Sequence, residues 1–537
     1  MNESRFNVID QPWILVKDVD GAQKTVSMRE LFQRAHQFEC LAGELPSQDF
    51  AILRILLAVL YRVFDAEDHD SPTEEWGEIW ERTDLPVEEI NEYLDKWHDR
   101  FYLFDSAQPW LQVADLESVS GSTKPVDLLI PDCPIEGGLF SMRRDYESIT
   151  PAEAARWLVH CHAYDISGIK TGAVGDSRVK GGKGYPIGIG WAGWLGGIVV
   201  TGSNLRETLL LNLVFVREHD ERDVPIWEEP PLTSAQREDA QAHGPVALFT
   251  WPQRRIRLFQ NSAGNVSEIL ICNGDPIAYQ FQDSNEVMCG WRLSAPQSKK
   301  FGQDVYMPRQ FDPSETLWRG INALLPTSKA DSSNNDFKNC PVIEWSADLA
   351  LDDILPRTQI TKIKTVGVVY GPQSASWDEI FSDELAFNVL LASSESTRAK
   401  EAVYLAAERA AEAARIVGRL GGNLAIAAGG DPDSASTDAR SLGFSELDNP
   451  FRNWLANFSP SKDVNEQLSA WTYKVYQLIR DLATQLIENA GPEAWVGRSV
   501  TQNNTTRVYS TGQAEVWFQH ALQKALPRSS KTQEVNA

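Results

Sequence analysis

VYLAAERAAEAARIVGRL, at residues 403–420, decides the fold class of the C-terminal part of the chain. Apolar and small side chains recur in it at spacings of three and four, the period of one face of an α-helix, at Val403, Ala406, Ala410, Ala413, Val417 and Leu420. A second face of the same kind is formed by Val464, Leu468, Trp471, Val475, Leu478 and Leu482. Two further helical stretches, "NPFRNWLANF" (449–458) and "GQAEVWFQHALQKAL" (512–526), bring the number of helices to four.

We therefore predict a four-helix bundle over residues 381–527. Within it, the Gly-, Asp- and Ser-rich stretch "GGDPDSASTDARS" (429–441) is expected to be an exposed loop, and residues 528–537 a disordered tail.

Residues 1–380 mix helical and strand patterns. The run "QDFAILRILLAVLYRVF" (48–64) is apolar nearly all round and predicts a buried helix, whereas "ALFTW" (247–251) and "RRIRLF" (254–259) are typical of short strands. In "RRIRLF" the alternation places Arg255 and Arg257 together on one exposed face. The predicted fold class is therefore α+β, with a large irregular mixed N-terminal domain followed by the C-terminal four-helix bundle.

Charge and cysteine content exclude several classes of protein. The formal net charge is −25, which argues against a protein that coats naked DNA or RNA by bulk electrostatics, so any nucleic-acid contact must be local. No CxxC pair occurs, so neither a zinc ribbon nor a disulfide framework is indicated and no metal or cofactor is expected. The scattered cysteines fit a reducing compartment, so a cytoplasmic protein is expected. No membrane partner is expected, because no apolar run reaches the roughly 20 residues that span a bilayer.

The stretch "GGKGYPIGIGWAGWLGG" (181–197) holds eight glycines in seventeen residues. A P-loop would need GxxxxGK followed by Ser or Thr, but Gly182 and Lys183 are followed by glycine. "GIGWAG" (188–193) has the letters of a dinucleotide fingerprint, yet no strand precedes it and no helix follows it. Tight packing and contact with a nucleic-acid backbone are the two readings left open.

Local charge favours the second reading. Between positions 170 and 205 the sequence has one acidic residue, Asp176, and four basic residues, which are Lys170, Arg178, Lys180 and Lys183. Enzyme signatures are absent: there is no HExxH and no GxSxG, and the adjacent His160, Cys161 and His162 have no third ligand at a recognisable spacing, so they are interpreted as core or interface residues.

Several segments, taken in order, resemble one family. They are "FNVIDQPWILV" (6–16), "QDFAILRILLAVLYRVF", the glycine stretch leading into "NLRETLLLNLV" (204–214), "VVYGPQSA" (368–375) and the terminal bundle. The chain resembles the CasA family, the large subunit of the type I-E CRISPR surveillance complex Cascade. The resemblance implies a non-enzymatic subunit of an RNA-guided antiviral complex, which recognises the protospacer-adjacent motif in double-stranded DNA, helps to start unwinding and recruits the helicase-nuclease. Its implied partners are the other Cascade subunits, the 5′ handle of the CRISPR guide RNA, the double-stranded target DNA and the helicase-nuclease effector.

The resemblance also implies site residues. The tip of the loop that lies in the DNA minor groove corresponds to Gly181, Gly182, Lys183 and Gly184, with "GIGWAGWLGG" as its packed base. The glutamine wedge that splits the first base pairs corresponds to Gln373, with Ser374 beside it, and the guide-RNA contact corresponds to Phe140. The family's lysine finger is missing near Gln282, where Lys299 and Lys300 are the substitutes at hand. Two alternatives stay open: a protein-binding scaffold that reads no DNA, and a nucleotide-binding enzyme.

Overall fold

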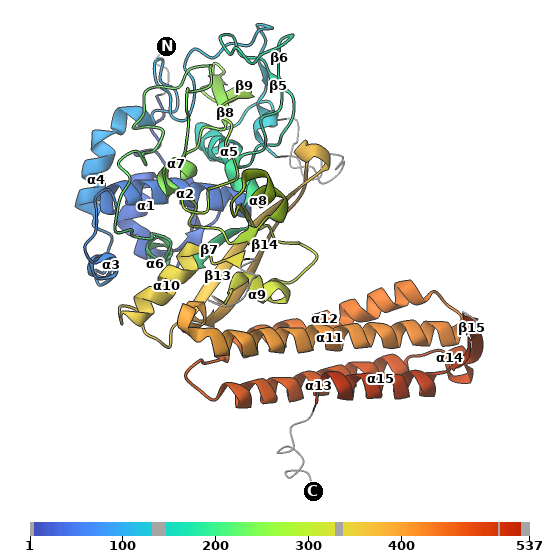
Figure 1. Cartoon of the computed structure of the whole chain (residues 1–537). Coiled ribbons are helices and arrows are strands. Elements are labelled where there is room, and N and C mark those ends of the chain that lie inside the picture. The colour runs from blue at the N-terminus through green and yellow to red at the C-terminus, as the bar shows by residue number, and fades with distance from the viewer. Residues whose placement is uncertain (1–4, 132–145, 328–336, 503–504, 528–537) are drawn as a thin grey trace. The chain divides into compact units, whose positions relative to one another are not determined.

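A computed structural model of the chain describes residues 5–131, 146–327, 337–502 and 505–527. The chain divides into two compact units, shown in Figure 1. The first unit comprises Met1–Pro313, Ser333–Leu355 and Lys362–Glu384, and the second comprises Ser314–Ser332, Pro356–Thr361 and Leu385–Ala537. Helices and strands are mixed and the C-terminal helices are long, which confirms the predicted fold class.

Helix α2 (Pro46–Phe64) forms the centre of the first unit. Every residue from Phe50 to Tyr61 is buried, because the helix is apolar nearly all round and other elements surround it. It packs against α5 (Pro151–Tyr164) and α7 (Pro245–Phe249). The remaining helices of this unit are α1 (Met28–Arg34), α3 (Pro72–Trp80), α4 (Val87–Lys96), α6 (Leu205–Leu211), α8 (Ala295–Phe301) and α10 (Pro341–Leu351).

Helix α7 corrects one prediction. The segment "ALFTW" was expected to be a strand, but residues 245–249 form a short helix that starts with Pro245 in its first turn. Proline has a backbone angle that suits this position, and the helix buries Val246, Leu248 and Phe249.

The strands from β1 to β14, most of whose residues lie in the first unit, form several small antiparallel sheets. Their orders are β2-β1-β3, β11-β10-β12, β14-β13-β7, β4-β9-β8 and β5-β6. Their bounds are β1 (Ile14–Asp18), β2 (Gln23–Val26), β3 (Phe38–Leu41), β4 (Lys124–Pro125), β5 (Lys170–Thr171), β6 (Lys183–Gly184), β7 (Gly197–Thr201), β8 (Arg254–Gln260), β9 (Val266–Asn273), β10 (Trp291–Leu293), β11 (Tyr306–Pro308), β12 (Phe337–Lys338), β13 (Ile360–Tyr370) and β14 (Trp377–Asn388). In Figure 1, β5 and β6 lie at the same end of this unit as β8 and β9, and β5 contacts β9.

The second unit is built from long helices. They are α11 (Thr397–Ala428), α12 (Pro432–Asn457), α13 (Val464–Glu488) and α15 (Thr511–Ala525), with the shorter α9 (Ile321–Leu324) and α14 (Pro492–Val496) and the hairpin β15 (Arg498–Gln502) to β16 (Thr505–Tyr509). Helix α11 packs against α12, α13 and α15, as its predicted apolar face requires.

The contact between α11 and α12 is made of small residues. A Cβ atom added to Gly421 would lie 2.5 Å from the Cβ of Ala439, and one added to Gly443 would lie 3.0 Å from the Cα of Ala414. The two helix backbones therefore approach as closely as alanine and glycine allow.

The exposed loop predicted at residues 429–441 is wrong beyond Gly430, because α12 starts at Pro432. Asp431 caps this helix by accepting hydrogen bonds from the backbone N–H groups of Asp433 and Ser434, at 3.2 and 3.3 Å. Proline in the first turn and aspartate at the cap are both start signals of a helix, and they outweigh the loop-like composition. In the described residues, no helix combines the length and the apolar character needed to cross a membrane.

Candidate nucleic-acid interface

Residues 180–184 form the tip of a small β-hairpin, called here the glycine hairpin. Strands β5 and β6 pair antiparallel, with Lys170 opposite Gly184. Beyond them, the N–H of Lys180 donates to the carbonyl of Lys183 at 3.0 Å, and the N–H of Lys183 donates back at 3.2 Å. The two residues between them, Gly181 (φ 60°) and Gly182 (φ 73°), both have positive φ, as a two-residue type I′ turn requires.

Glycine serves different purposes in the two halves of the cluster. At Gly181 an added Cβ would meet no atom within 4 Å, so the turn needs glycine there for its backbone conformation and not for lack of space. In the later half, a Cβ on Gly190, Gly193 or Gly197 would overlap, respectively, the backbone of Ala163, the phenol of Tyr370 or the ring of Phe50. From Gly190 on, this later half is closely packed, as expected for "GIGWAGWLGG", whereas at Gly188 an added Cβ would meet no atom within 4 Å.

The positive charge of this region is smaller than the sequence indicated. Lys170 pairs with Asp165 at 2.6 Å, and Arg178 pairs with Asp176 at 2.9 Å. Lys180 and Lys183 are exposed, and no carboxylate of the described residues pairs with either of them. The glycine hairpin therefore presents two lysines that are available to an anionic partner.

Residues 371–376, called here the glutamine loop, connect β13 to β14. The loop is closed by hydrogen bonds from the N–H of Gly371 to the carbonyl of Ser376 at 3.1 Å, and from the N–H of Ser374 to the carbonyl of Gly371 at 2.9 Å. Gln373 (φ 57°) and Ser374 (φ 54°) both lie in the left-handed region. For residues other than glycine this conformation costs about 1–2 kcal/mol each.

Gln373 is exposed, and its side-chain amide makes no hydrogen bond within the described part of the chain. Backbone strain of this kind clusters at binding and catalytic sites and persists only where the surrounding structure maintains it. The strained glutamine loop thus holds an amide group in solvent with its hydrogen-bonding capacity unused.

One short segment joins the two loops. In residues 165–171, the N–H of Ser167 donates to the carbonyl of Ser374 at 2.8 Å, and Lys170 begins the strand that pairs with the glycine hairpin. Three residues of chain span at most about 10 Å. The structure therefore brings together two loops that lie almost two hundred positions apart in the sequence, and this segment connects them.

Arg254, the first residue of β8, binds the start of this segment through its buried side chain. Its side chain is 1% exposed, and its Nε donates to Oδ2 of Asp165 at 2.5 Å. One terminal nitrogen donates to the carbonyls of Ile166 at 2.9 Å and of Gly188 at 2.8 Å. Burial alone would raise the pKa of Asp165, but the charges of Lys170 and Arg254 outweigh it and hold that pKa below its usual value. Asp165 is therefore charged and paired at neutral pH.

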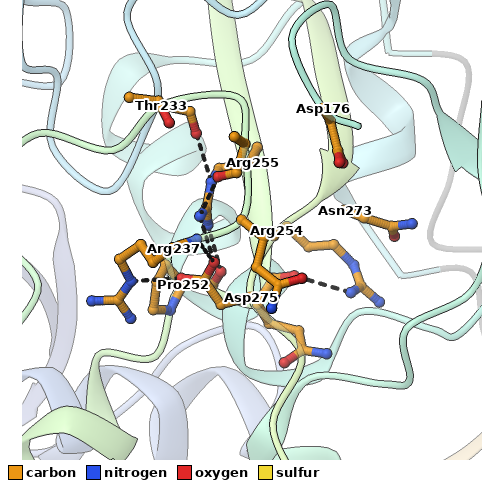
Figure 2. Close-up of polar contacts among 12 residues, drawn as sticks. Asp176, Thr233, Arg237, Pro252, Arg254, Arg255, Asn273 and Asp275 are labelled. Carbon is orange, nitrogen blue, oxygen red and sulfur yellow. Dashed lines mark hydrogen bonds and ion pairs between the residues drawn. The ribbon is translucent and has the colours of Figure 1, made fainter. Parts of the chain in front are cut away.

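The neighbouring Arg255 corrects the predicted exposed face of "RRIRLF". It is fully buried and donates to Oδ1 of Asp275 at 2.6 Å and to the carbonyl of Thr233 at 2.8 Å (Figure 2). The chain at residues 233–235 covers the face of β8 that was expected to meet solvent. Arg257 is half-buried and donates to the carbonyl of Leu116 at 3.1 Å.

Sequence reasoning missed Arg254, Asp165 and Ser167. The sequence held one signal for Arg254. Adjacent residues of a strand point to opposite faces, so Arg254 cannot share the face that was predicted to be exposed at Arg255. No pattern in the sequence marks the other two.

His160 and His162 are core residues, as interpreted. His160 Nε2 lies 2.9 Å from the hydroxyl of Ser47, and His162 Nε2 lies 2.8 Å from the carbonyl of Leu111. Burial lowers their pKa values to about 3 and about 4, so both are neutral at physiological pH. No group of His, Cys, Asp and Glu in the described residues is arranged to hold a metal ion.

The other predicted site residues are placed as follows. Phe140 lies outside the described residues. Gln282 donates its amide to the carbonyl of Ala278 at 3.1 Å. Lys299 and Lys300 are exposed in the last turn of α8.

Comparison with known proteins identifies the family. The family model described as CRISPR-associated protein Cse1 matches residues 7–482. The chain belongs to this family. CRISPR-associated protein CasA/Cse1 of Thermus thermophilus is 31% identical over 339 residues, which are 60% of this chain and 60% of that relative, less than two thirds of its length.

Solved structures show the same fold over almost the whole chain. Thermobifida fusca Cse1 is 39% identical with a TM-score of 0.88, over 97% of this chain and 98% of that chain. A chain of a CRISPR RNA-guided surveillance complex has a TM-score of 0.67, over 90% of this chain and 99% of that chain, at 17% identity. The latter likeness concerns the fold alone.

Proposed function

We propose that the chain is the large, non-catalytic subunit of a type I-E Cascade complex, which recognises the protospacer-adjacent motif in double-stranded DNA and helps to start unwinding. The observation that carries this proposal is the link between the two loops: residues 165–171 join an exposed glycine turn to an exposed, strained glutamine. The turn carries two lysines that pair with no carboxylate among the residues that the structure describes. The names of the Cse1 relatives support a role in CRISPR defence.

The glycine hairpin suits a DNA minor groove. That groove is about 6 Å wide, so it admits a bare backbone more readily than side chains. Gly181 and Gly182 present such a backbone at an open tip, and Lys180 and Lys183 flank it with positive charge. In this pose the lysines bind the phosphates along the groove, and the backbone reads the groove floor and width. The contacts depend little on base identity, so several related motifs are tolerated.

The glutamine loop suits the role of a wedge. Separating a base step costs a few kcal/mol, which a wedge must supply through contacts made in the opened state. Gln373 projects from a turn whose strain already exists in the free protein, and its amide can both donate to and accept from an unpaired base. Ser374 fixes the loop through its carbonyl, which Ser167 holds.

The remaining partners follow from the net charge of −25. Such a chain does not hold DNA alone, so basic Cascade subunits and the guide RNA position the duplex, and acidic faces of this chain dock basic partners. In this assembly Phe140 contacts the 5′ handle of the guide RNA by stacking, and the assembled complex recruits the helicase-nuclease.

The proposal is tested by gel-shift titration of the guide-RNA complex with and without this chain, on matched targets that carry a good or a scrambled motif. We expect motif-dependent binding only when the chain is present. Lys183→Ala should weaken binding to both targets and reduce the slope of log affinity against log salt by about one, since one phosphate contact is lost.

Equal binding with and without the chain would exclude DNA reading and favour the scaffold alternative. A matched control is Lys124→Ala, since Lys124 is also exposed but lies in β4, outside both loops; it should leave the salt slope unchanged.

A further inference from the structure

Arg254 contacts the chain on either side of the glycine hairpin, before its first strand and after its second. One terminal nitrogen of its guanidinium donates to the carbonyl of Ile166, which precedes the hairpin, and to that of Gly188, which follows it. The hairpin strands pair between these two points. The buried side chain therefore closes the base of the hairpin as a bridge.

The same side chain reaches the glutamine loop through a single peptide group. The carbonyl of Ile166 and the N–H of Ser167 belong to one planar amide. Arg254 donates to the carbonyl side at 2.9 Å, and the N–H side donates to the carbonyl of Ser374 at 2.8 Å. Hydrogen bonds in such a chain strengthen one another, and the rigid plane transmits the orientation set at one end to the other.

From this geometry we infer that Arg254 is a positioning residue, which makes the glycine hairpin and the glutamine loop act as one motif-reading unit. The inference rests on the proposed function of the two loops. Arg254 touches no DNA, because it is 1% exposed, and acts through Ile166, Ser167 and Gly188. A duplex that seats the hairpin correctly thereby has the wedge at the right place to open the adjacent base step.

Arginine is required at this position for its shape. Its planar fork directs donors at Asp165, at the two carbonyls on either side of the hairpin and at the carbonyl of Gln253, the last at 3.1 Å. Lysine would keep the charge opposite Asp165, but a single ammonium group cannot reach acceptors that lie in these different directions. Arg254→Lys therefore removes the bridge while it preserves the charge balance of the buried site.

The neighbouring arginine provides a matched control. Arg255 is equally buried and also pairs with a carboxylate, Asp275, and with backbone carbonyls, but none of these belongs to the hairpin or to the glutamine loop. Arg255→Lys thus reproduces the loss of buried hydrogen bonds, and any difference between the two variants reports the contacts with residues 165–188.

The test is a double-mutant cycle in the assembled guide-RNA complex. The two changes are Lys183→Ala in the hairpin and Gln373→Ala in the loop. Permanganate footprinting measures strand opening at a good motif. In the native background we expect the two effects to be coupled by roughly tenfold, as for groups that act through shared contacts. In the Arg254→Lys background the coupling should fall to about one and the preference for a good over a scrambled motif should fall by a similar factor, whereas Arg255→Lys should preserve both.

Hydrogen exchange on the chain alone gives a second measurement. The amides of residues 166–168 should exchange faster in Arg254→Lys and at the native rate in Arg255→Lys. If Arg254→Lys fails to enter the complex, Asp165→Asn replaces it, since this change removes the carboxylate charge that holds Nε, and the same loss of coupling is expected.

Two outcomes overturn the inference and are distinguishable. If Lys183→Ala and Gln373→Ala each leave motif-dependent binding and opening unchanged in the native background, the proposed function fails and the inference fails with it. If both single changes act but the coupling persists in Arg254→Lys, or is equally reduced in Arg255→Lys, the proposed function stands and Arg254 has only a structural role.

Discussion

Replacing Gly181 by asparagine separates the conformational role of the turn from close approach to DNA. In the free protein no atom lies within 4 Å of the position of an added Cβ, so the substitution creates no clash and removes no packing. The only cost comes from the backbone, which has φ 60°. Asparagine tolerates this region and is preferred in type I′ turns, so the free energy of unfolding should change by less than about 0.5 kcal/mol.

The effect on DNA binding should be much larger. If a bare backbone fills a groove about 6 Å wide, the amide group added by asparagine either does not fit or forces the groove and the hairpin apart. Overfilling a close-packed contact costs about 1–3 kcal/mol, which corresponds to a loss of affinity of roughly 5- to 140-fold. A large loss of binding with native stability is therefore expected from a single exposed residue.

The assays are urea unfolding of the chain alone and motif-dependent target binding by the assembled complex. Gly264→Asn is the matched control, because Gly264 also has positive φ, 82°, and also has no atom within 4 Å of an added Cβ, but lies in the turn between β8 and β9. Native binding by Gly181→Asn would refute the view that the tip of the hairpin enters a confined space. A stability loss well above that of Gly264→Asn would instead show that the turn packs more tightly than the geometry indicates.

Three further predictions concern strain, pH and buried charge. Gln373→Gly relieves one left-handed residue, so it should raise the free energy of unfolding by up to about 1 kcal/mol in urea titrations while it abolishes strand opening; an unchanged opening rate would show that Gln373 is no wedge. His162→Gln, which keeps an N–H for the carbonyl of Leu111, bears on the pH dependence of stability. Because burial holds the folded pKa of His162 at about 4, below the unfolded value of about 6.5, the unfolded chain binds the extra proton in this window and stability falls as pH falls. The variant should lose less stability between roughly pH 7.5 and pH 5 than the native chain, by up to about 1.4 kcal/mol per pH unit, and an equal loss would contradict the assignment of a buried neutral imidazole. Glu286→Gln should destabilise the chain by about 3–5 kcal/mol, because Glu286 is fully buried and accepts from both terminal nitrogens of Arg54 and from Trp191 Nε1. Glu412→Gln, at a half-buried carboxylate that pairs only with exposed arginines, should change stability by less than about 0.5 kcal/mol, and similar effects of the two changes would contradict this contrast.

The sequence predicts the elements of this fold where the signal is local. The predicted face around Val403 repeats with the period of the helix, and all six of its residues are buried in the structure. On the predicted face around Val475, Val464, Trp471 and Val475 are buried. Leu468, Leu478 and Leu482 of that face are only half-buried. Composition misleads at residues 432–441, where serine and aspartate indicate a loop but the cap at Asp431 starts a helix.

The sequence does not predict contacts that depend on distant segments. Whether Arg255 faces solvent is decided by the chain at residues 233–235, which covers β8 in three dimensions only. The link between Ser167 and Ser374 is a hydrogen bond between backbone groups, so it does not depend on either side chain and leaves no pattern in the sequence. The resemblance and the local chemistry were enough to nominate the candidate residues of the two loops. The contacts of Arg254 and residues 165–171 that link these loops are visible only in the structure.

The small-residue contact between α11 and α12 restricts how the bundle can move. Long side chains that interlock across a helix pair can change rotamers and let the helices slide by small steps, which is the basis of shear motion. At Gly421 and Gly443 the facing atoms are alanine methyl groups and backbone, which have no alternative rotamers to adopt. Any movement within this bundle would therefore carry α11 and α12 together as one rigid pair, and adaptation would occur where other helices pack against them.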